Sequence, residues 1–247
     1  MIQQQLDIPT ADGSADALLV RPKTTDHLPG IINLTDGFGF RPAFVEQSKR
    51  IAARGYVVLT PNIFYRTAKP PLFDSELDLR DEKVMARFRE LTGSLTPDAM
   101  ERDASAYVDF LARQPDVSAG PMGVVGFCFS GQFALRAAAA RPDRIGAAAS
   151  FHGGGLYKDS DQSPHLLLPR IKARLLFGHA ENDRGMPAEA IAKFEEALEN
   201  WGGEYESETY EGAAHGWMIP GGRVYHPVQS ERGFEKLMGL FDGALRE

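Results

Sequence analysis

Short apolar runs of strand length alternate with longer amphipathic stretches along the chain. The apolar runs fall at residues 30–35, 56–60, 122–126, 146–151, 173–177 and 204–210. Apolar residues recur every three or four positions, a spacing that indicates helices, at residues 44–54, 81–91, 97–113, 131–140, 188–201 and 228–245. Strands that alternate with helices predict an α/β fold with a mostly parallel sheet and helices on both faces.

The N-terminal segment predicts an antiparallel start to this sheet. Residues 4–8 and 16–22 are strand-like, and Asp12-Gly13 lies in the turn between them, a dipeptide typical of tight hairpins. No internal repeat, low-complexity tract or linker interrupts the chain. Because 247 residues is a common size for one α/β domain, we expect a single domain that spans residues 1–247.

Composition narrows the class of protein. An apolar content of 43% and a charged content of 25% are those of an ordinary globular protein. The formal net charge of -7 argues against a nucleic-acid partner, since a phosphate backbone requires a basic face. No apolar run reaches the roughly 18 residues of a membrane span, and the N-terminus lacks the layout of a secretory signal. We expect a cytoplasmic protein with no membrane partner.

The chain has one cysteine, Cys128. It therefore has no internal disulfide and no thiolate cage for a metal. The histidines lack the spacing of metal ligands, and the glycines that follow strands form neither a phosphate loop nor a dinucleotide fingerprint. We expect no cofactor and no metal, and any chemistry of Cys128 is that of a free thiol.

In open α/β sheets, reactive groups gather beyond the carboxyl ends of the strands. The polar residues that follow predicted strands are Asp36, Cys128, His152, Asp183 and His215. Cys128 lies in the segment GFCFSG, where small residues allow a sharp turn from strand to helix, as in a nucleophile elbow. Such a turn places the sulfur at a helix N-terminus, where the helix dipole and free amides favour a thiolate.

The order of these residues indicates a catalytic triad. Asp183 follows the strand-like segment RLLFG, and His215 follows GGEYESETY. Nucleophile, acid, then histidine is the chain order of α/β-hydrolases. Each residue also has a structural interpretation: a lone cysteine is commonly a small buried apolar residue, and Asp183 fits a helix cap ahead of Pro187. Position and chain order favour the triad.

At these residues the sequence resembles the dienelactone hydrolase family, whose elbow is Gly-x-Cys-x-Gly-Gly and whose triad is cysteine, aspartate and histidine. The likeness covers nearly the whole chain. It implies an α/β-hydrolase fold with Cys128 as the nucleophile, Asp183 as the acid that orients the histidine, and His215 as the base.

The family also carries an acid after its first buried strand, in a Glu-x-Phe-Gly context that Asp36 matches. The resemblance implies that Asp36 restrains the thiol until substrate binds. It also implies that the backbone amides of Gly37 and Phe129 form the oxyanion hole. An aspartate followed by a glycine is equally typical of an ordinary turn.

The sequence departs from the family pattern at three places. Ser130 replaces a glycine of the elbow, Asp36 is one methylene shorter than glutamate, and Ile219 stands where the family has an arginine that binds the substrate carboxylate. Arg223 lies a little further along the same loop, and Arg80 falls near the family's other carboxylate-binding arginine. The predicted substrate contacts are Arg80, His152, Trp217 and Arg223.

These features predict hydrolysis of a small-molecule ester or lactone through an acyl-thioester on Cys128. Two alternatives stay open. One is a broader carboxylesterase or thioesterase on the same scaffold, which the isoleucine at 219 favours. The other is a protein without catalytic activity that binds a small ligand or senses oxidants through its thiol. The sequence leaves the natural substrate and the oligomeric state open.

Overall fold

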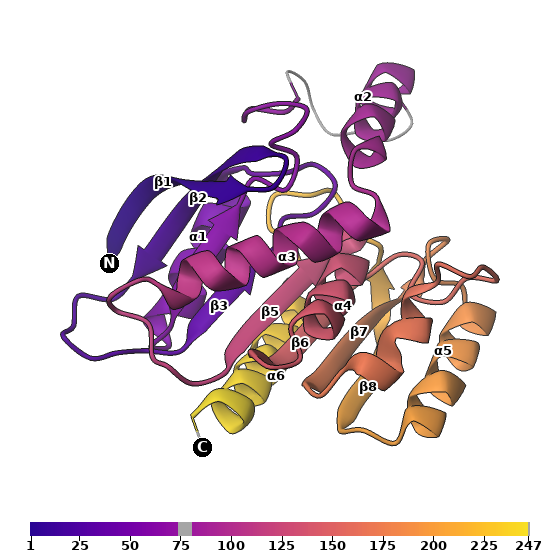
Figure 1. Cartoon of the computed structure of the whole chain (residues 1–247). Helices are drawn as coiled ribbons and strands as arrows, with labels where there is room; N and C mark the ends of the chain where they lie inside the picture. The colour runs from indigo at the N-terminus through magenta and orange to yellow at the C-terminus, as the bar shows by residue number, and fades with distance from the viewer. Residues whose placement is uncertain (74–80, 247) are drawn as a thin grey trace.

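One sheet organises the molecule. The computed structural model describes residues 1–73 and 81–246, and within these residues eight strands pair in the order β1-β2-β4-β3-β5-β6-β7-β8 (Figure 1). The strands are β1 (Ile2–Thr10), β2 (Gly13–Arg21), β3 (Gly30–Asn33), β4 (Val57–Pro61), β5 (Met122–Phe127), β6 (Ile145–Phe151), β7 (Arg174–Asn182) and β8 (Tyr205–Ala214). The β1–β2 and β2–β4 pairs are antiparallel and the others are parallel. The predicted hairpin and the mostly parallel sheet are both confirmed.

Helices cover both faces of the sheet, as predicted. The helices are α1 (Pro42–Ala53), α2 (Glu82–Gly93), α3 (Pro97–Ala112), α4 (Gly131–Ala140), α5 (Ala188–Trp201) and α6 (Pro227–Leu245). Helices α3, α4 and α5 share one apolar core with the sheet, and α1 and α6 share the other. Helix α2 projects beyond these two layers (Figure 1), and Leu91 near its C-terminal end joins the core of α3 and α4.

The strands supply both cores because successive side chains of a strand point to opposite faces. Ile31 packs with α1 and α6, whereas Ile32 packs with α3 and α4. On β5, Val125 likewise packs in the core of α1 and α6, and Val124 packs in the core of α3 and α4. Strands buried on both faces need continuous apolar sequence, which explains why these runs are apolar without alternation.

The structure differs from the sequence prediction in the ends of several strands, β1, β7 and β8 being longer than predicted, and in one added element. Strand β7 continues to Asn182 through polar residues because it pairs with β8, up to the Asn182–Ala214 pair. A 3₁₀ helix, Pro164–Arg170, was not predicted. None of the helices in the described part of the chain combines the length and the apolar character needed to cross a bilayer.

Candidate active site

The turn that follows β5 holds Cys128 in an unusual backbone conformation. Cys128 begins a 3₁₀ turn that leads into α4, and its φ is +55°. A Cβ atom at Gly126 would lie 2.1 Å from the carbonyl oxygen of Ser130, and one at Gly131 would lie 2.3 Å from Ser150 Oγ. Both positions therefore require glycine. The left-handed conformation of a non-glycine residue is a strain that nucleophile elbows share.

Ser130, a departure from the family motif, fits this turn. Its φ is −79°, so the position does not require glycine. Its buried hydroxyl accepts a hydrogen bond from the amide of Phe127 at 2.8 Å and donates to the carbonyl of the same residue at 3.1 Å. The serine thus ties the end of β5 to the start of α4.

The three residues of the predicted triad lie in one hydrogen-bonded line. His215 Nε2 lies 2.9 Å from Cys128 Sγ, and His215 Nδ1 lies 2.6 Å from Asp183 Oδ2. The other carboxylate oxygen of Asp183 accepts from the amide of Gly185 at 2.7 Å. The parallel pairing of β7 and β8 ends at Asn182 and Ala214, so the next residue of each strand is the acid or the histidine.

Two hydrogen bonds control the charge of His215. Burial alone would lower its pKa, but the bonds to Asp183 and Cys128 outweigh burial and raise the pKa of His215 to about 10. The imidazole is then protonated at neutral pH. The protonated ring presents Nε2 to the sulfur of Cys128 and Nδ1 to the carboxylate of Asp183.

An aromatic cluster surrounds the expected oxyanion hole. A Cβ atom at Gly37 would lie 2.2 Å from the ring of Phe88 on α2, so Gly37 permits this close approach. The ring of Phe88 also meets those of Phe38, at 6.2 Å, and Phe129, at 6.5 Å between centroids. Phe73 contacts Phe38 at 5.5 Å. These contacts place apolar side chains next to the amides of Gly37 and Phe129, which are predicted to form the oxyanion hole.

Asp36 has a partner that sequence reasoning missed. The guanidinium of Arg41 donates two hydrogen bonds of 2.6 Å to the buried carboxylate of Asp36, and the amide of Phe38 donates to the same carboxylate at 2.9 Å. The guanidinium also lies over the ring of Phe44, 5.0 Å from its centroid. The missed signal is an arginine directly before Pro42, where the loop after β3 enters α1. The predicted restraint of Cys128 by Asp36 stays a prediction.

His152 lies against the triad histidine. It follows β6, is 1% exposed, and its ring centroid lies 5.4 Å from that of His215 in an edge-to-face arrangement. Burial lowers the pKa of His152 well below its usual range, and the positive charges of His215 and Arg41 lower it further. The imidazole of His152 is therefore neutral.

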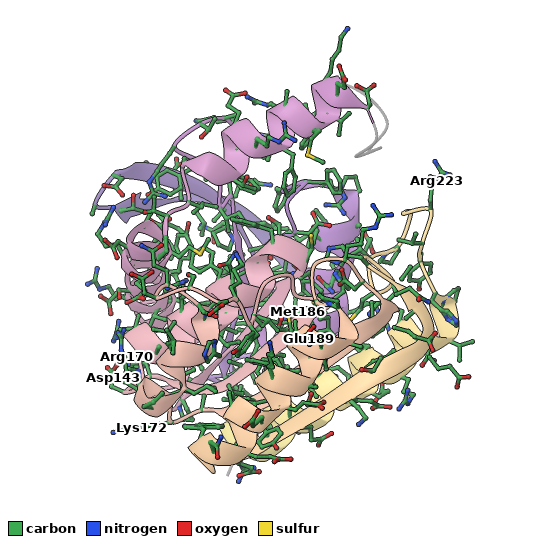
Figure 2. The ribbon with its side chains drawn as sticks, turned by 90° about the vertical axis from the view of Figure 1, so that its right-hand side faces the viewer. Asp143, Arg170, Lys172, Met186, Glu189 and Arg223 are labelled. Carbon is green, nitrogen blue, oxygen red and sulfur yellow. The ribbon has the colours of Figure 1, made fainter. Side chains whose placement is uncertain are left out.

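The other predicted substrate contacts lie in different surroundings. Trp217 is completely buried and stacks on Tyr210 with 4.3 Å between ring centroids. Ile219 is 4% exposed and packs in the core with α6. Arg223 is exposed and projects outward from its loop (Figure 2). Arg80 lies outside the described residues, and the substrate roles of these residues stay predictions.

The triad region contains no cluster of metal-ligating side chains among the described residues, and an open hollow lies elsewhere on the molecule. Among the described residues, no group of three or more histidine, cysteine, aspartate or glutamate side chains gathers as a metal site would require. An open hollow of about 600 Å³ lies between α3 and the β1–β2 turn, and its lining includes Arg102 and Arg170 but none of the triad residues. The hydrogen-bonded residues Cys128, Asp183 and His215 lie instead at the carboxyl ends of β5, β7 and β8.

The fold is that of an α/β-hydrolase. Three features define it: the strand order, the sharp turn after β5, and the positions of Asp183 after β7 and His215 after β8. The chain belongs to the dienelactone hydrolase family, whose profile matches residues 15–245. It is therefore a hydrolase of lactone or ester bonds.

Individual relatives agree with this family. A carboxymethylenebutenolidase from Rhodococcus opacus is 27% identical over 198 residues, which are 80% of this chain and 73% of the relative. A Synechocystis protein assigned as a carboxymethylenebutenolidase is 23% identical over 97% of this chain and 96% of the relative. A solved Klebsiella pneumoniae structure assigned as a dienelactone hydrolase has a TM-score of 0.86, with 22% identity over 97% of this chain and 98% of that one.

Proposed function

We propose that the protein hydrolyses small esters or lactones through covalent catalysis by Cys128, with His215 and Asp183 completing the triad. One observation carries the proposal: His215 bridges the thiol and the carboxylate, with 2.9 Å on one side and 2.6 Å on the other. These are the contacts by which a base activates a nucleophile while a third group orients the base.

The first half-reaction forms the acyl-thioester. His215 holds the proton of Cys128, and the thiolate attacks the substrate carbonyl. The amides of Phe129 and Gly37 stabilise the resulting oxyanion, a contribution of about 3 kcal/mol for one such donor. The tetrahedral intermediate collapses as the C–O bond breaks, and His215 Nε2 gives its proton to the departing alkoxide.

The second half-reaction hydrolyses that thioester. His215, now neutral, takes a proton from water while the water oxygen attacks the acyl carbon. The second tetrahedral intermediate expels the Cys128 thiolate and releases the carboxylic acid. The thiolate and the imidazolium are then restored, and Asp183 holds the ring in one tautomer throughout.

The surroundings of the site favour neutral substrates with an apolar acyl group. The aromatic rings of Phe38, Phe88 and Phe129 adjoin the proposed oxyanion hole. Ile219 places an apolar side chain where the family has a carboxylate-binding arginine. These features favour a carboxylesterase that accepts a broader range of neutral esters than a dienelactone hydrolase does, through the same mechanism.

A hydrolysis screen of lactones and short esters tests the proposal, with Cys128→Ala as the matched control. We expect turnover by the wild type and none above background by the variant. Treatment with a slow ester, followed by acid quenching and peptide mass analysis, should find the acyl group on Cys128. Turnover by Cys128→Ala at the wild-type rate would refute the proposed mechanism.

A further inference from the structure

The loop after β6 is tied to both parts of the proposed triad. The amide of Gly154 donates to the carbonyl of Cys128 at 3.2 Å, and the amide of Gly155 donates at 2.9 Å to the carbonyl of Gly185, two residues after Asp183. His152 begins this loop with a φ of +40°. Cys128 and His152 are the two non-glycine residues with positive φ in the described part of the chain. Strained backbone of this kind is concentrated at functional sites.

Burial of the His152 side chain in its present surroundings costs free energy, because its polar ring nitrogens are removed from water. Within the residues that the structure describes, neither ring nitrogen of His152 has a hydrogen-bond partner, although the side chain is almost completely buried. Its ring contacts those of Trp217 and Phe127 as well as that of His215. An apolar ring would make the same contacts without burying two polar nitrogens. An imidazole at this position therefore indicates a partner that binds during the reaction.

A second buried histidine provides a comparison. His179 on β7 is 1% exposed, and its Nε2 also lacks a partner among the described residues. Its ring lies nearly parallel to that of Phe177, with 9° between the planes, and its φ is not positive. Among the described residues, a buried ring nitrogen without a partner is therefore not peculiar to His152. His152 differs because it combines that feature with strained backbone and direct contact with His215.

We propose that His152 is a further catalytic residue, which accepts a hydrogen bond from the water that hydrolyses the acyl-thioester on Cys128. This inference rests on the proposed function. The water gives one proton to His215 Nε2, and its oxygen forms the new bond to the acyl carbon while the C–S bond breaks. The other O–H of the water points to a ring nitrogen of His152, which fixes the direction of attack and takes no proton.

The electrostatic surroundings suit this division of labour. Burial and the charge of His215 lower the pKa of His152, so its imidazole stays neutral and retains one nitrogen that accepts a hydrogen bond. His215 is the stronger base because Asp183 stabilises its protonated form. Two histidines in contact therefore have different roles, one as the base and one as the acceptor that orients the water.

Pre-steady-state kinetics with p-nitrophenyl acetate separate the two half-reactions, because p-nitrophenolate reports acylation and acid-quenched mass analysis reports the acyl group on Cys128. In His152→Phe we expect acylation within about threefold of the wild type and deacylation slower by about tenfold or more, in keeping with the usual contribution of positioned acid–base groups. Hydroxylamine, a stronger nucleophile than water, should restore release of the acyl group.

Three further variants make the test specific. His152→Gly accepts the positive φ without strain, so the same selective loss in this variant excludes a backbone effect and covers the case in which His152→Phe does not fold. His152→Asn tolerates this conformation and retains polar atoms, and we expect deacylation within about threefold of the wild type. His179→Phe is the matched control and should leave the ratio of acylation to deacylation unchanged.

The outcomes separate this inference from the proposed function. Deacylation at the wild-type rate in both His152→Phe and His152→Gly would overturn the role of His152 and leave the triad in place. Equal loss of acylation and deacylation in these variants would also overturn it, because a merely structural role slows both steps. If no variant ever carries an acyl group on Cys128, the proposed function itself fails.

Discussion

At the scale of single residues, the reactivity of the site depends on which group holds a proton. His215 contacts a carboxylate through Nδ1 and a thiol through Nε2, and both contacts favour its charged form. His152, in contact with it, is held neutral by burial. Environments that separate the pKa values of neighbouring groups are a common sign of assigned acid and base roles.

The carboxylate of Asp183 is the residue whose charge should matter most. Asp183→Asn conserves size and the bond from the amide of Gly185, but an amide cannot stabilise the imidazolium. We expect kcat/KM to fall by about three to four orders of magnitude at a temperature where the variant is still folded, although loss of the charged partner of His215 lowers the melting temperature. Ester hydrolysis and thermal unfolding of the same preparation measure both. Activity that falls only in proportion to the unfolded fraction would indicate a structural role instead.

The paired charges of Asp36 and Arg41 should stabilise the loop between β3 and α1. Arg41→Ala leaves a carboxylate that is 5% exposed without its guanidinium, and we expect a loss of about 2 kcal/mol in the free energy of unfolding. Urea unfolding measures it. The double variant Asp36→Asn with Arg41→Ala should lose clearly less than the sum of the single variants, and strict additivity would contradict the pairing.

At the scale of elements, the pattern of apolar and small residues predicted the helices and turns that local sequence determines. Helix α5 begins and ends at the predicted residues, and the small residues around Cys128 predicted the turn between β5 and α4. The extension of β7 to Asn182 was not predictable, because its residues are polar and only pairing with β8 makes them a strand. The Asp36–Arg41 pair depends on loop geometry, which no periodic pattern reveals.

The segment between β8 and α6 should determine the preference for substrate charge. Ile219, which is buried in the core with α6, stands at the sequence position where the family has a carboxylate-binding arginine. We therefore predict that one charged contact to substrate is absent, a loss of about 1.5 to 3 kcal/mol. We expect kcat/KM for a carboxylate-bearing lactone to be at least about tenfold below that for its neutral methyl ester. The comparison is made in the wild type and in Ile219→Arg, which should favour the anion.

Two arginines provide the controls for this comparison. Arg223 is exposed on the same loop, and Arg80 lies in the segment outside the described residues. Arg223→Ala and Arg80→Ala should leave the preference for the neutral ester intact. A strong preference for the carboxylate in the wild type that disappears in Arg223→Ala would contradict the prediction and identify Arg223 as the carboxylate-binding residue.

At the scale of the whole molecule, buried histidines link the fold to pH. Burial lowers the pKa of His179 to about 4, whereas the unfolded chain retains the ordinary value near 6.5. Between these values the unfolded state binds a proton that the folded state does not, so stability falls as the pH falls. His152 acts in the same direction. His215 acts oppositely, because its raised pKa contributes stability that is full below about 6.5 and is lost as the pH rises to about 10.

The acid side of this balance gives a quantitative test. For His179 alone, acidification from pH 6.5 to 4 should remove about 3 kcal/mol of unfolding free energy, at about 1.4 kcal/mol per pH unit. In His179→Phe the loss of unfolding free energy due to His179 disappears. The carboxylates titrate as in the wild type, so their contribution cancels when the two proteins are compared. Urea unfolding at both pH values should therefore show a smaller acid loss in the variant. An equal loss would mean that His179 is protonated in the folded protein. Its burial against the rings of Phe177 and Phe194 opposes that state, and this burial lowers the pKa more than the charge of Asp183 raises it.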